Sequence, residues 1–411
     1  MGIRIALVVV IAACSYAEPP DVLPPVFAAV HPPIASTGDT IMLEGSFSET
    51  TMVQFPGGDV RAATLHGPHR ASVVVPAGAT EGDLFVTTAN TKLGPVAFRR
   101  AAFGPALREF RQTVSLRTPR REFATAVVKN HVYLLGGYSS RGVLDSIEHA
   151  EIGPDGTLGP FEELPIKLLG PRRHATAIVL GDWLYVLNGG QDGPEPTVQR
   201  ARISADGTLD AFQAAGSLTH PHSGHSAIVI GDQLYVLGGD ALEAAEIEGD
   251  ALLAFRVVDT TSVPAAPDPI SRTAAQTQVI GDSLCLLGGY DVDITPSTTA
   301  VCAPIGSDGS LGGFHSTASQ VMPRADGADL VIGTRLYMFG GATSSSSLVS
   351  VVRVPLEPPS EFAEFAEGAM GVARQGAAAI LVGDSVCVIG GGNLETSFLD
   401  SVECAAFTAA E

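Results

Sequence analysis

Basic residues, aromatic residues and long apolar runs are all scarce in this sequence of 411 residues. It contains 24 Lys and Arg against 44 Asp and Glu, for a formal net charge of −20, and a single tryptophan. Binding to nucleic acid or to an anionic membrane surface depends on clustered Lys and Arg, so this balance speaks against both. No stretch approaches the ~18 continuous apolar residues of a membrane-spanning helix. We therefore expect no nucleic-acid partner, and a membrane link only through a lipid anchor.

Common catalytic and cofactor-binding motifs are missing as well. The sequence has no HExxH, no P-loop, no GxGxxG and no CxxC. GHSAI (residues 224–228) imitates a nucleophile elbow without its closing glycine, so we expect Ser226 to begin a strand. His220, His222 and His225 have a spacing that suits a metal, but no carboxylate is adjacent, and solvated or hydrogen-bonded histidines are expected instead. We predict no catalytic residue, no metal and no cofactor.

The N-terminus carries the pattern of an export signal. Arg4 precedes nine apolar residues from Ile5 to Ala13, a run too short to span a bilayer but typical of a signal peptide. The run ends in IAAC (residues 11–14), which resembles the lipobox of bacterial lipoproteins, where the cysteine becomes the lipidated first residue. We predict a targeting segment over residues 1–17 and lipidation of Cys14, with cleavage after Ala17 as the alternative. Either outcome places the protein at the bacterial outer membrane or cell surface, in the periplasm, or outside the cell.

The four remaining cysteines form two pairs with the same spacing. Cys285 and Cys387 each lie in an apolar strand that ends in a glycine doublet, and Cys302 and Cys404 follow 17 residues later in the next strand. If those strands are antiparallel neighbours, the two sulfurs of each pair face one another. We predict two disulfides, which an oxidising compartment permits. Four buried free thiols are the alternative.

A glycine doublet recurs with a nearly constant period. The doublets begin at residues 136, 188 (Asn-Gly), 238, 288, 340 and 390, at intervals of 52, 50, 50, 52 and 50 residues. Each unit reads as an apolar strand, a tight turn, a second strand, the doublet, a variable loop, a third strand and a segment with a phenylalanine. Asp-Gly pairs at Asp155, Asp206 and Asp308 are predicted turns, with calcium binding as the alternative. Such small antiparallel sheets must stack on one another, and radial stacking makes a propeller.

The doublets, the preceding apolar-Tyr-apolar strands and the period near 50 resemble kelch repeats over roughly residues 104–411. The resemblance implies a six-bladed kelch-type β-propeller over residues 101–411. The usual third-strand tyrosine is absent and the usual fourth-strand tryptophan is phenylalanine, so the resemblance implies no eukaryotic adaptor partner. The chain ends after the third strand of the sixth unit, and a spare fourth-strand segment with Phe110 precedes the first unit. We predict that residues 106–113 complete the last blade and close the ring.

Residues 18–100 follow a different pattern of short strands separated by Gly and Pro turns. Gly38, Gly45, Phe47, VPAG (residues 75–78) and Gly82 resemble an IPT/TIG immunoglobulin-like domain. The predicted fold is therefore all-β, with an immunoglobulin-like β-sandwich preceding the propeller. Such domains act as spacers or binding modules, and we expect this one to be a stalk.

The register of the repeat brings out one set of charged residues. The residue sixteen positions before each doublet is Arg120, Arg172, His222, Arg272, Arg324 or Arg374. Each precedes the innermost strand of its unit, so the six should surround one mouth of the central channel, on the face of the variable loops. This ring can bind an anionic ligand, because arginine makes bidentate bonds to carboxylates. The alternative is structural: each side chain bonds the backbone of the neighbouring blade.

Together these patterns favour a non-enzymatic protein that presents a propeller to a protein or glycan ligand, with recognition in the variable loops. The kelch resemblance offers an enzymatic alternative, because six-bladed kelch propellers include periplasmic sialic-acid mutarotases. That activity needs channel residues, for which Arg272, Arg324 and His222 are the candidates. A copper oxidase resembling galactose oxidase is disfavoured, since there are six units and no Tyr/Cys/His copper set. A purely structural surface protein is the third interpretation.

Overall fold

The computed structural model describes residues 26–409, with gaps at residues 102, 192, 194, 239–240, 259–271, 292, 321, 357–360, 364 and 394. The described residues contain strands and no helix. Accordingly, no helix in this part of the chain is long and apolar enough to cross a membrane. The predicted targeting segment, with Cys14, lies outside the described residues.

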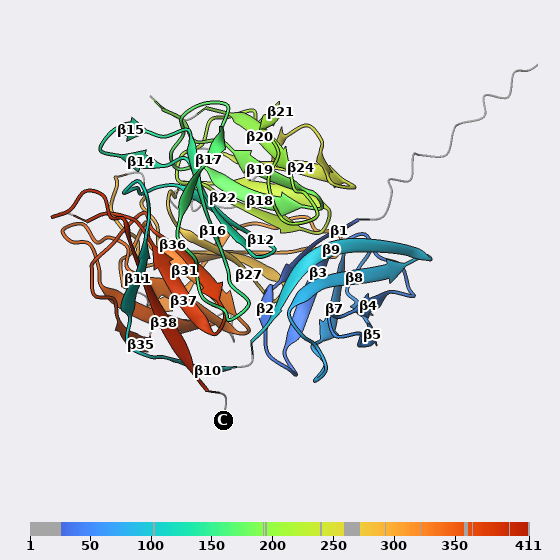
Figure 1. Ribbon diagram of the computed structural model, residues 1–411. Coiled ribbons are helices and arrows are strands. Elements are labelled where there is room, and N and C mark those ends of the chain that lie inside the picture. The colour runs from blue at the N-terminus through green and yellow to red at the C-terminus, as the bar shows by residue number, and fades with distance from the viewer. Residues whose placement is uncertain are drawn as a thin grey trace, which may run out of the picture.

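The first strands form a two-layer β-sandwich, the N-terminal module, over residues 27–100 (Figure 1, blue). One sheet has the order β1 (Phe27–His31), β3 (Thr40–Gly45), β7 (Arg70–Val74) and β6 (Thr64–Leu65). The other has the order β2 (Ile34–Ala35), β9 (Thr91–Arg100), β8 (Gly82–Thr88), β4 (Met52–Gln54) and β5 (Val60–Ala62). Leu43 and Val73 of the first sheet share one buried core with Val86 and Phe98 of the second. Alternating apolar residues thus supply the inner faces of both layers.

Six small sheets follow, and we number them in chain order (Figure 1, teal to red). Sheet 1 contains β12 (Ala124–Val128), β13 (His131–Leu135), β16 (Ser146–Glu151) and β17 (Glu162–Lys167); sheet 2 contains β18 (Thr176–Leu180), β19 (Trp183–Leu187), β20 (Thr197–Arg202) and β21 (Gln213–Ser217). Sheet 3 contains β22 (Ser226–Ile230), β23 (Gln233–Leu237), β24 (Leu242–Glu248), β25 (Ala251–Leu252) and β26 (Arg256–Val257). Sheet 4 contains β27 (Gln276–Ile280), β28 (Ser283–Leu287), β29 (Ala300–Pro304), β30 (His315–Gln320) and β34 (Glu361–Ala363).

Sheet 5 contains β31 (Ala328–Ile332), β32 (Arg335–Phe339), β33 (Ser350–Pro355) and β35 (Phe365–Ala369). Sheet 6 contains β36 (Ala378–Val382), β37 (Ser385–Ile389) and β38 (Ser401–Ala409), and it also takes in β10 (Phe103–Leu107) and β11 (Arg111–Ser115) from ahead of sheet 1. A separate hairpin, β14 (Tyr138–Ser139) and β15 (Gly142–Val143), follows the doublet of sheet 1. The first three strands of each sheet are antiparallel neighbours in chain order, as the turn pattern predicts.

Sheet 6 is joined to the start of the ring through these early strands. Arg111 and Ser115 of β11 lie opposite Cys404 and Ser401 of β38. The segment predicted to close the ring, residues 106–113, thus overlaps both β10 and β11. Phe110, between the two strands, lies in a core with residues of sheets 5 and 6, its ring 6.2 Å from that of Phe339.

The tyrosine of the second strand connects successive sheets. Tyr133, Tyr185 and Tyr235 donate hydrogen bonds of 2.8–3.0 Å to backbone carbonyls in a turn of the next sheet. Cys285 and Cys387 occupy the same strand position in sheets 4 and 6. They form disulfides with Cys302 and Cys404, directly across the ladder and with Cα atoms 4.1 Å apart. The two predicted disulfides are therefore confirmed.

Candidate functional site

The six residues sixteen positions before the doublets bond to their own sheets. In each, a side-chain nitrogen contacts the carbonyl oxygen of the first doublet residue at 2.5–3.2 Å. The pairs are Arg120–Gly136, Arg172–Asn188, His222–Gly238, Arg272–Gly288, Arg324–Gly340 and Arg374–Gly390. All six are buried except Arg272, which is half-buried. Ligand binding by this set stays a prediction, and the structure gives these side chains protein partners.

Their main chains, by contrast, bond to the neighbouring sheet. For Arg120, Arg172, Arg324 and Arg374, the second doublet residue of the preceding sheet donates its N–H to the arginine carbonyl, at 2.8 Å from Gly137 to Arg172. Gly391 makes the same bond to Arg120, at 2.9 Å, and so links sheet 6 to sheet 1. The structural alternative expected each side chain to bond the backbone of the neighbouring sheet. In the structure the side chain instead bonds the doublet of its own sheet, and the backbone carbonyl bonds the neighbouring sheet.

Three buried glutamates bond to members of this set, and sequence analysis missed them. We call the six residues and these three glutamates the framework. Glu148, Glu243 and Glu403 lie in the third strands of sheets 1, 3 and 6, at 2.7, 3.1 and 2.6 Å from Arg120, His222 and Arg374. Each also accepts two backbone N–H bonds from the segment before the first strand. A charged residue within an apolar strand was the signal that could have found them, because a buried charge needs a partner.

Two positions beyond the arginines, the backbone forms a ring about the axis of the six sheets. The ring residues are Glu122, His174, Gly224, Ala274, Asp326 and Gly376, each with a positive φ of 53–62°. Their amides bond from one sheet to the next, at 2.6–3.1 Å, in the order Glu122 to Gly376, Gly376 to Asp326, Asp326 to Ala274, Ala274 to Gly224, and His174 to Glu122. We call this set the axial ring.

The axial ring is regular in its backbone and irregular in its side chains. Gly224, Ala274 and Gly376 bring a methyl group or nothing, whereas the ring carries titratable groups at its other three positions. A left-handed backbone costs little for glycine and more for other residues, so side chains that persist there need a reason. Sequence reasoning passed over this position, although its variation between copies, E, H, G, A, D and G, was visible.

Glu122 is the centre of a charged cluster at the ring. Its carboxylate lies 2.9 Å from His174 Nε2, 3.0 Å from Arg121 Nε and 3.4 Å from Arg173 Nη1. Burial acts to raise the pKa of Glu122, but the hydrogen bond and charge of His174 and the two guanidiniums lower it on balance. Two guanidiniums and an imidazole thus surround one carboxylate.

Asp326 faces the same region from sheet 5. Burial raises the pKa of Asp326 to about 6, with His174 acting to lower it and Glu122 to raise it. On the adjoining strand β31, Asp329 accepts a 2.7 Å hydrogen bond from Gln278, and burial raises the pKa of Asp329 to about 6 as well. The axis of the sheets therefore holds carboxyl groups that change protonation near neutral pH.

Aromatic rings stand beside the charged cluster. Tyr138 and Phe398 lie in the loops after the doublets of sheets 1 and 6, edge to face with centroids 5.2 Å apart. The Arg121 guanidinium lies 5.6 Å from both centroids, and that of Arg173 lies 4.9 Å from Tyr138. Cations over aromatic faces form a stacking surface for planar or ring-shaped ligands.

The other candidate residues from the sequence make contacts that a structural role explains. His222 belongs to the buried framework, and His225 is buried with no hydrogen bond to either ring nitrogen, its pKa lowered to about 3 by burial and by His222 and His174. Ser226 begins β22 as expected. The described part of the chain contains no group of three or more His, Cys, Asp or Glu placed to hold a metal. Asp155, Asp206 and Asp308 each accept hydrogen bonds from the residue two positions on, as in turns.

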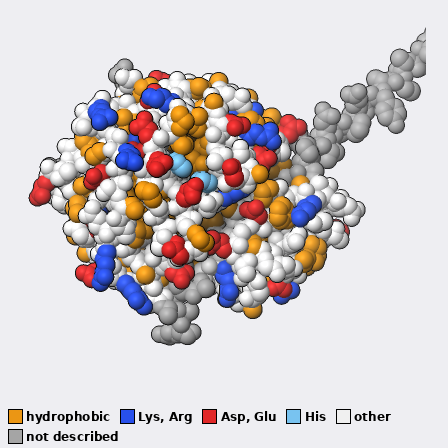
Figure 2. All heavy atoms as spheres, in the orientation of Figure 1, with side chains coloured by type: hydrophobic (Ala, Val, Ile, Leu, Met, Phe, Trp, Pro, Cys, Tyr) orange, Lys and Arg blue, Asp and Glu red, His pale blue; other side chains and the backbone are white. Residues whose placement is uncertain are grey.

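The outer surface adds little to this picture. Figure 2 shows acidic and basic side chains interspersed on the visible face, without a continuous basic patch among the described residues there.

Comparison with known proteins informs the fold. No protein-family model matches the sequence, and no curated protein matches it. A solved structure titled "Structure of YjhT" is similar, with a TM-score of 0.56 and 14% sequence identity over 70% of this chain and 95% of that chain. At this identity the likeness concerns the fold alone. The likeness and the small all-β sheets fit a β-propeller.

Proposed function

We propose that this chain is an exported binding protein, in which a six-bladed kelch-type propeller and an IPT/TIG-like module present the axial ring to a protein or glycan ligand. The observation that carries the proposal is the contrast within that ring. The positive φ of the ring is adopted most easily by glycine, yet Glu122, His174 and Asp326 interrupt an otherwise small-residue set. Variation placed on a repeated frame is where recognition lies in such folds.

The chemistry of the ring and its loops suits a ligand with both polar and ring-shaped or apolar parts. Arg121 and Arg173 offer cationic donors, and Tyr138 and Phe398 offer a stacking surface. Loops on the same face expose apolar side chains, with Leu169, Ile294 and Val349 at 57%, 77% and 41% of their full exposure. These groups support recognition of a protein or a glycan.

Export and anchoring remain part of the proposal. Two disulfides are stable in an oxidising compartment and rare in the cytosol. They support reading residues 1–17 as a targeting segment, with Cys14 as the lipidated residue. Mass spectrometry of the membrane fraction tests this directly: a diacylglyceryl group on Cys14 is expected, and a mature N-terminus at Glu18 contradicts lipidation.

The carbohydrate-active enzyme is the second candidate, favoured by Asp326. A carboxyl group whose pKa burial raises to about 6, near a His174–Glu122 pair, provides a general acid and base at the axial ring. Arg272, Arg324 and His222, the residues suggested by sequence, bond to backbone carbonyls and support this chemistry only indirectly.

A binding screen against glycan and peptide arrays tests the first candidate. The variant Arg121→Ala with Arg173→Ala should abolish binding and still fold cooperatively, with a lower melting temperature, because His174 continues to pair with Glu122. Arg141→Ala, an exposed arginine of the β14–β15 connection, serves as control. Binding that survives the double variant contradicts the axial ring as the site. Anomeric exchange of sugar acids, followed by NMR with Asp326→Asn, tests the enzyme: catalysis abolished by that variant favours the second candidate.

A further inference from the structure

The N-terminal module contacts four of the six sheets at one repeated feature, the turn between the first and second strands. The turn glycines of sheets 3 to 6 each take part: Gly231 N–H donates to Glu44, Gly281 O accepts from Arg70, Gly333 N–H donates to Ile34 O, and Gly383 O accepts from Arg99. Sheet 1 has Lys129-Asn130 in place of a glycine turn. Figure 1 shows the module beside the sheets, with β1 and β2 nearest to them.

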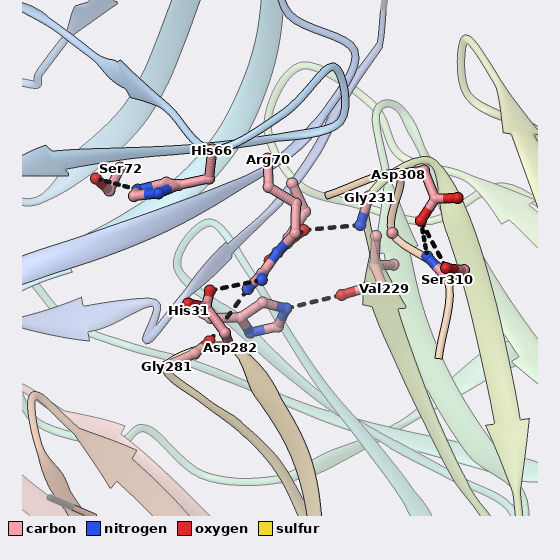
Figure 3. A network of polar contacts seen from close by, with 12 residues as sticks. His31, His66, Arg70, Ser72, Val229, Gly231, Gly281, Asp282, Asp308 and Ser310 are labelled. Atoms are coloured by element: carbon pink, nitrogen blue, oxygen red, sulfur yellow. Dashed lines mark hydrogen bonds and ion pairs between the residues drawn. The ribbon is translucent and has the colours of Figure 1, made fainter. Parts of the chain in front are cut away.

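A buried ion pair forms the centre of this interface. Arg70 and Glu44 lie opposite each other in β7 and β3 and are 1% and 0% exposed. Arg70 Nε lies 3.1 Å from the Glu44 carboxylate, and its Nη1 lies 2.8 Å from Asp282. Glu44 in turn accepts the Gly231 N–H at 2.7 Å. Figure 3 shows the Arg70 side chain extending from the module toward Asp282 and Gly281, beside Gly231.

Further contacts surround the ion pair. His31 Nε2 donates to the carbonyl of Val229 at 2.8 Å, and His69 Nδ1 lies 3.3 Å from Asp232. A Cβ atom built on Gly333 would lie 2.7 Å from the Asp39 carboxylate, so any other residue at this turn would displace that side chain of the module. Buried polar side chains of the module find hydrogen-bond and ion-pair partners on the sheets. Moving the module away would leave these groups unpaired, so we do not describe it as a hinged spacer.

The module leaves part of the six sheets uncovered. A cleft of about 1020 Å³ lies between the module and sheets 1, 5 and 6. Its lining includes the first-strand residues Thr125, Leu330 and Leu381, and Asp83 and Arg99 of the module. The module therefore covers one end of the first strands on four sheets and leaves sheet 1 open.

The same first strands connect the module to the axial ring. Gly224, Ala274, Asp326 and Gly376 of that ring each precede a module-bound turn glycine by seven residues. A single five-residue strand, β22, β27, β31 or β36, spans that distance. Fixing one end of so short a strand limits the movement of the other.

We propose that the N-terminal module is a brace: by holding the turn glycines of sheets 3 to 6, it fixes the four axial-ring positions on those sheets from behind. Arg70 and Glu44 are positioning residues in this arrangement and touch no ligand. The proposal concerns the apo protein, so it stands or falls independently of any ligand at the axial ring.

Hydrogen exchange in the full chain tests the brace. In Arg70→Met, which removes the bonds to Asp282 and Gly281, we expect the amides of Ala274, Asp326 and Gly376 to exchange about tenfold faster, a change of about 1.4 kcal/mol. The amide of His174, on a sheet without a polar module-bound turn, should be unchanged. Fluorescence of Trp183, the single tryptophan, reports docking, because it packs against the cluster that contains Val26.

A pair of glycine variants keeps the test valid if Arg70→Met fails to fold. Gly333→Ala and Gly281→Ala place alanine at nearly the same φ, +54° and +56°, but only the first directs its Cβ at the module. Faster exchange at the axial ring in Gly333→Ala and not in Gly281→Ala supports the brace. Undocking reported by Trp183 with unchanged axial amides overturns it, and so does equal exchange in the two variants.

Discussion

The two ends of the first strands differ in how much their residues vary from sheet to sheet. At the module end, glycine turns recur in sheets 3 to 6 and each meets the N-terminal module through its backbone. At the axial end, the backbone bonds recur but the side chains differ from sheet to sheet. Uniformity suits an interface that reads one repeated shape, and variation suits a site that reads one particular ligand. The difference teaches that in a repeated fold the departures from the repeat locate function better than the repeat itself.

Deleting residues 103–115 should have the largest effect, because it breaks the connection on which both ends depend. β10 and β11 both pair with β38, and their loss exposes that strand and opens sheet 6. We expect loss of cooperative unfolding, or destabilisation by more than about 5 kcal/mol, in calorimetry. Arg111→Ala, whose side chain is 80% exposed, leaves the backbone pairing intact and should melt like the wild type. A deletion variant with an unchanged melting temperature contradicts ring closure by these strands.

The framework arginines should differ among themselves according to their partners. Arg120 has the buried carboxylate of Glu148, whereas Arg172 has backbone carbonyl and hydroxyl acceptors. Removing one member of a buried ion pair costs about 3–5 kcal/mol, and leaving neutral acceptors unpaired costs about 1–3 kcal/mol. Urea unfolding of Arg120→Ala and Arg172→Ala should therefore rank them in that order. Equal losses would show that Glu148 contributes nothing specific.

Much of the scaffold could be predicted from sequence because it rests on local rules with a fixed period. Gly-Asp turns, doublets and alternating apolar residues specify each small sheet, and the equal spacing of Cys285–Cys302 and Cys387–Cys404 follows from strand register. The direction of the Arg120 side chain could not be predicted, since a contact within a sheet and one between sheets require the same sequence spacing. The docking of the module depends on Arg70 meeting residues more than 200 positions away, and no local pattern encodes that.

Removing a cross-strand disulfide or a tyrosine hydrogen bond should reduce the free energy of unfolding by a smaller amount. Replacing Cys387 and Cys404 with serine should cost about 3 kcal/mol, the value for a loop of this length. Tyr185→Phe removes two bonds of 2.9 Å, the one its hydroxyl donates to the carbonyl of Asp250 and the one it accepts from Arg200, and should cost about 1–2 kcal/mol. Urea unfolding with and without reductant measures both, and Tyr185→Phe should not respond to reductant. If it does, sheets 4 and 6 are coupled to sheet 2 more strongly than their contacts indicate.

An effect of similarly small size concerns Asp326, and the sign of its pH dependence distinguishes a buried carboxyl of the axial ring from a surface carboxyl. Burial raises the pKa of Asp326 from 3.8 to about 6, so its contribution to stability is present below pH 3.8 and is lost as the pH rises through about 6. Asp326→Asn should therefore gain about 1–2 kcal/mol on the wild type between these pH values, and the difference should be constant above them.

The exposed Asp308 provides the matched control, because hydrogen bonds from Ser310 lower its pKa. Its contribution is present above pH 3.8 and is lost as the pH falls, so Asp308→Asn should change with pH in the opposite direction. Thermal melting of both variants from pH 3 to 8 makes the comparison. A flat difference for Asp326→Asn would mean that its carboxyl is solvated like a surface group. The axial ring would then lack the desolvated acid on which the enzymatic candidate depends, while binding through Arg121 and Arg173 would be unaffected.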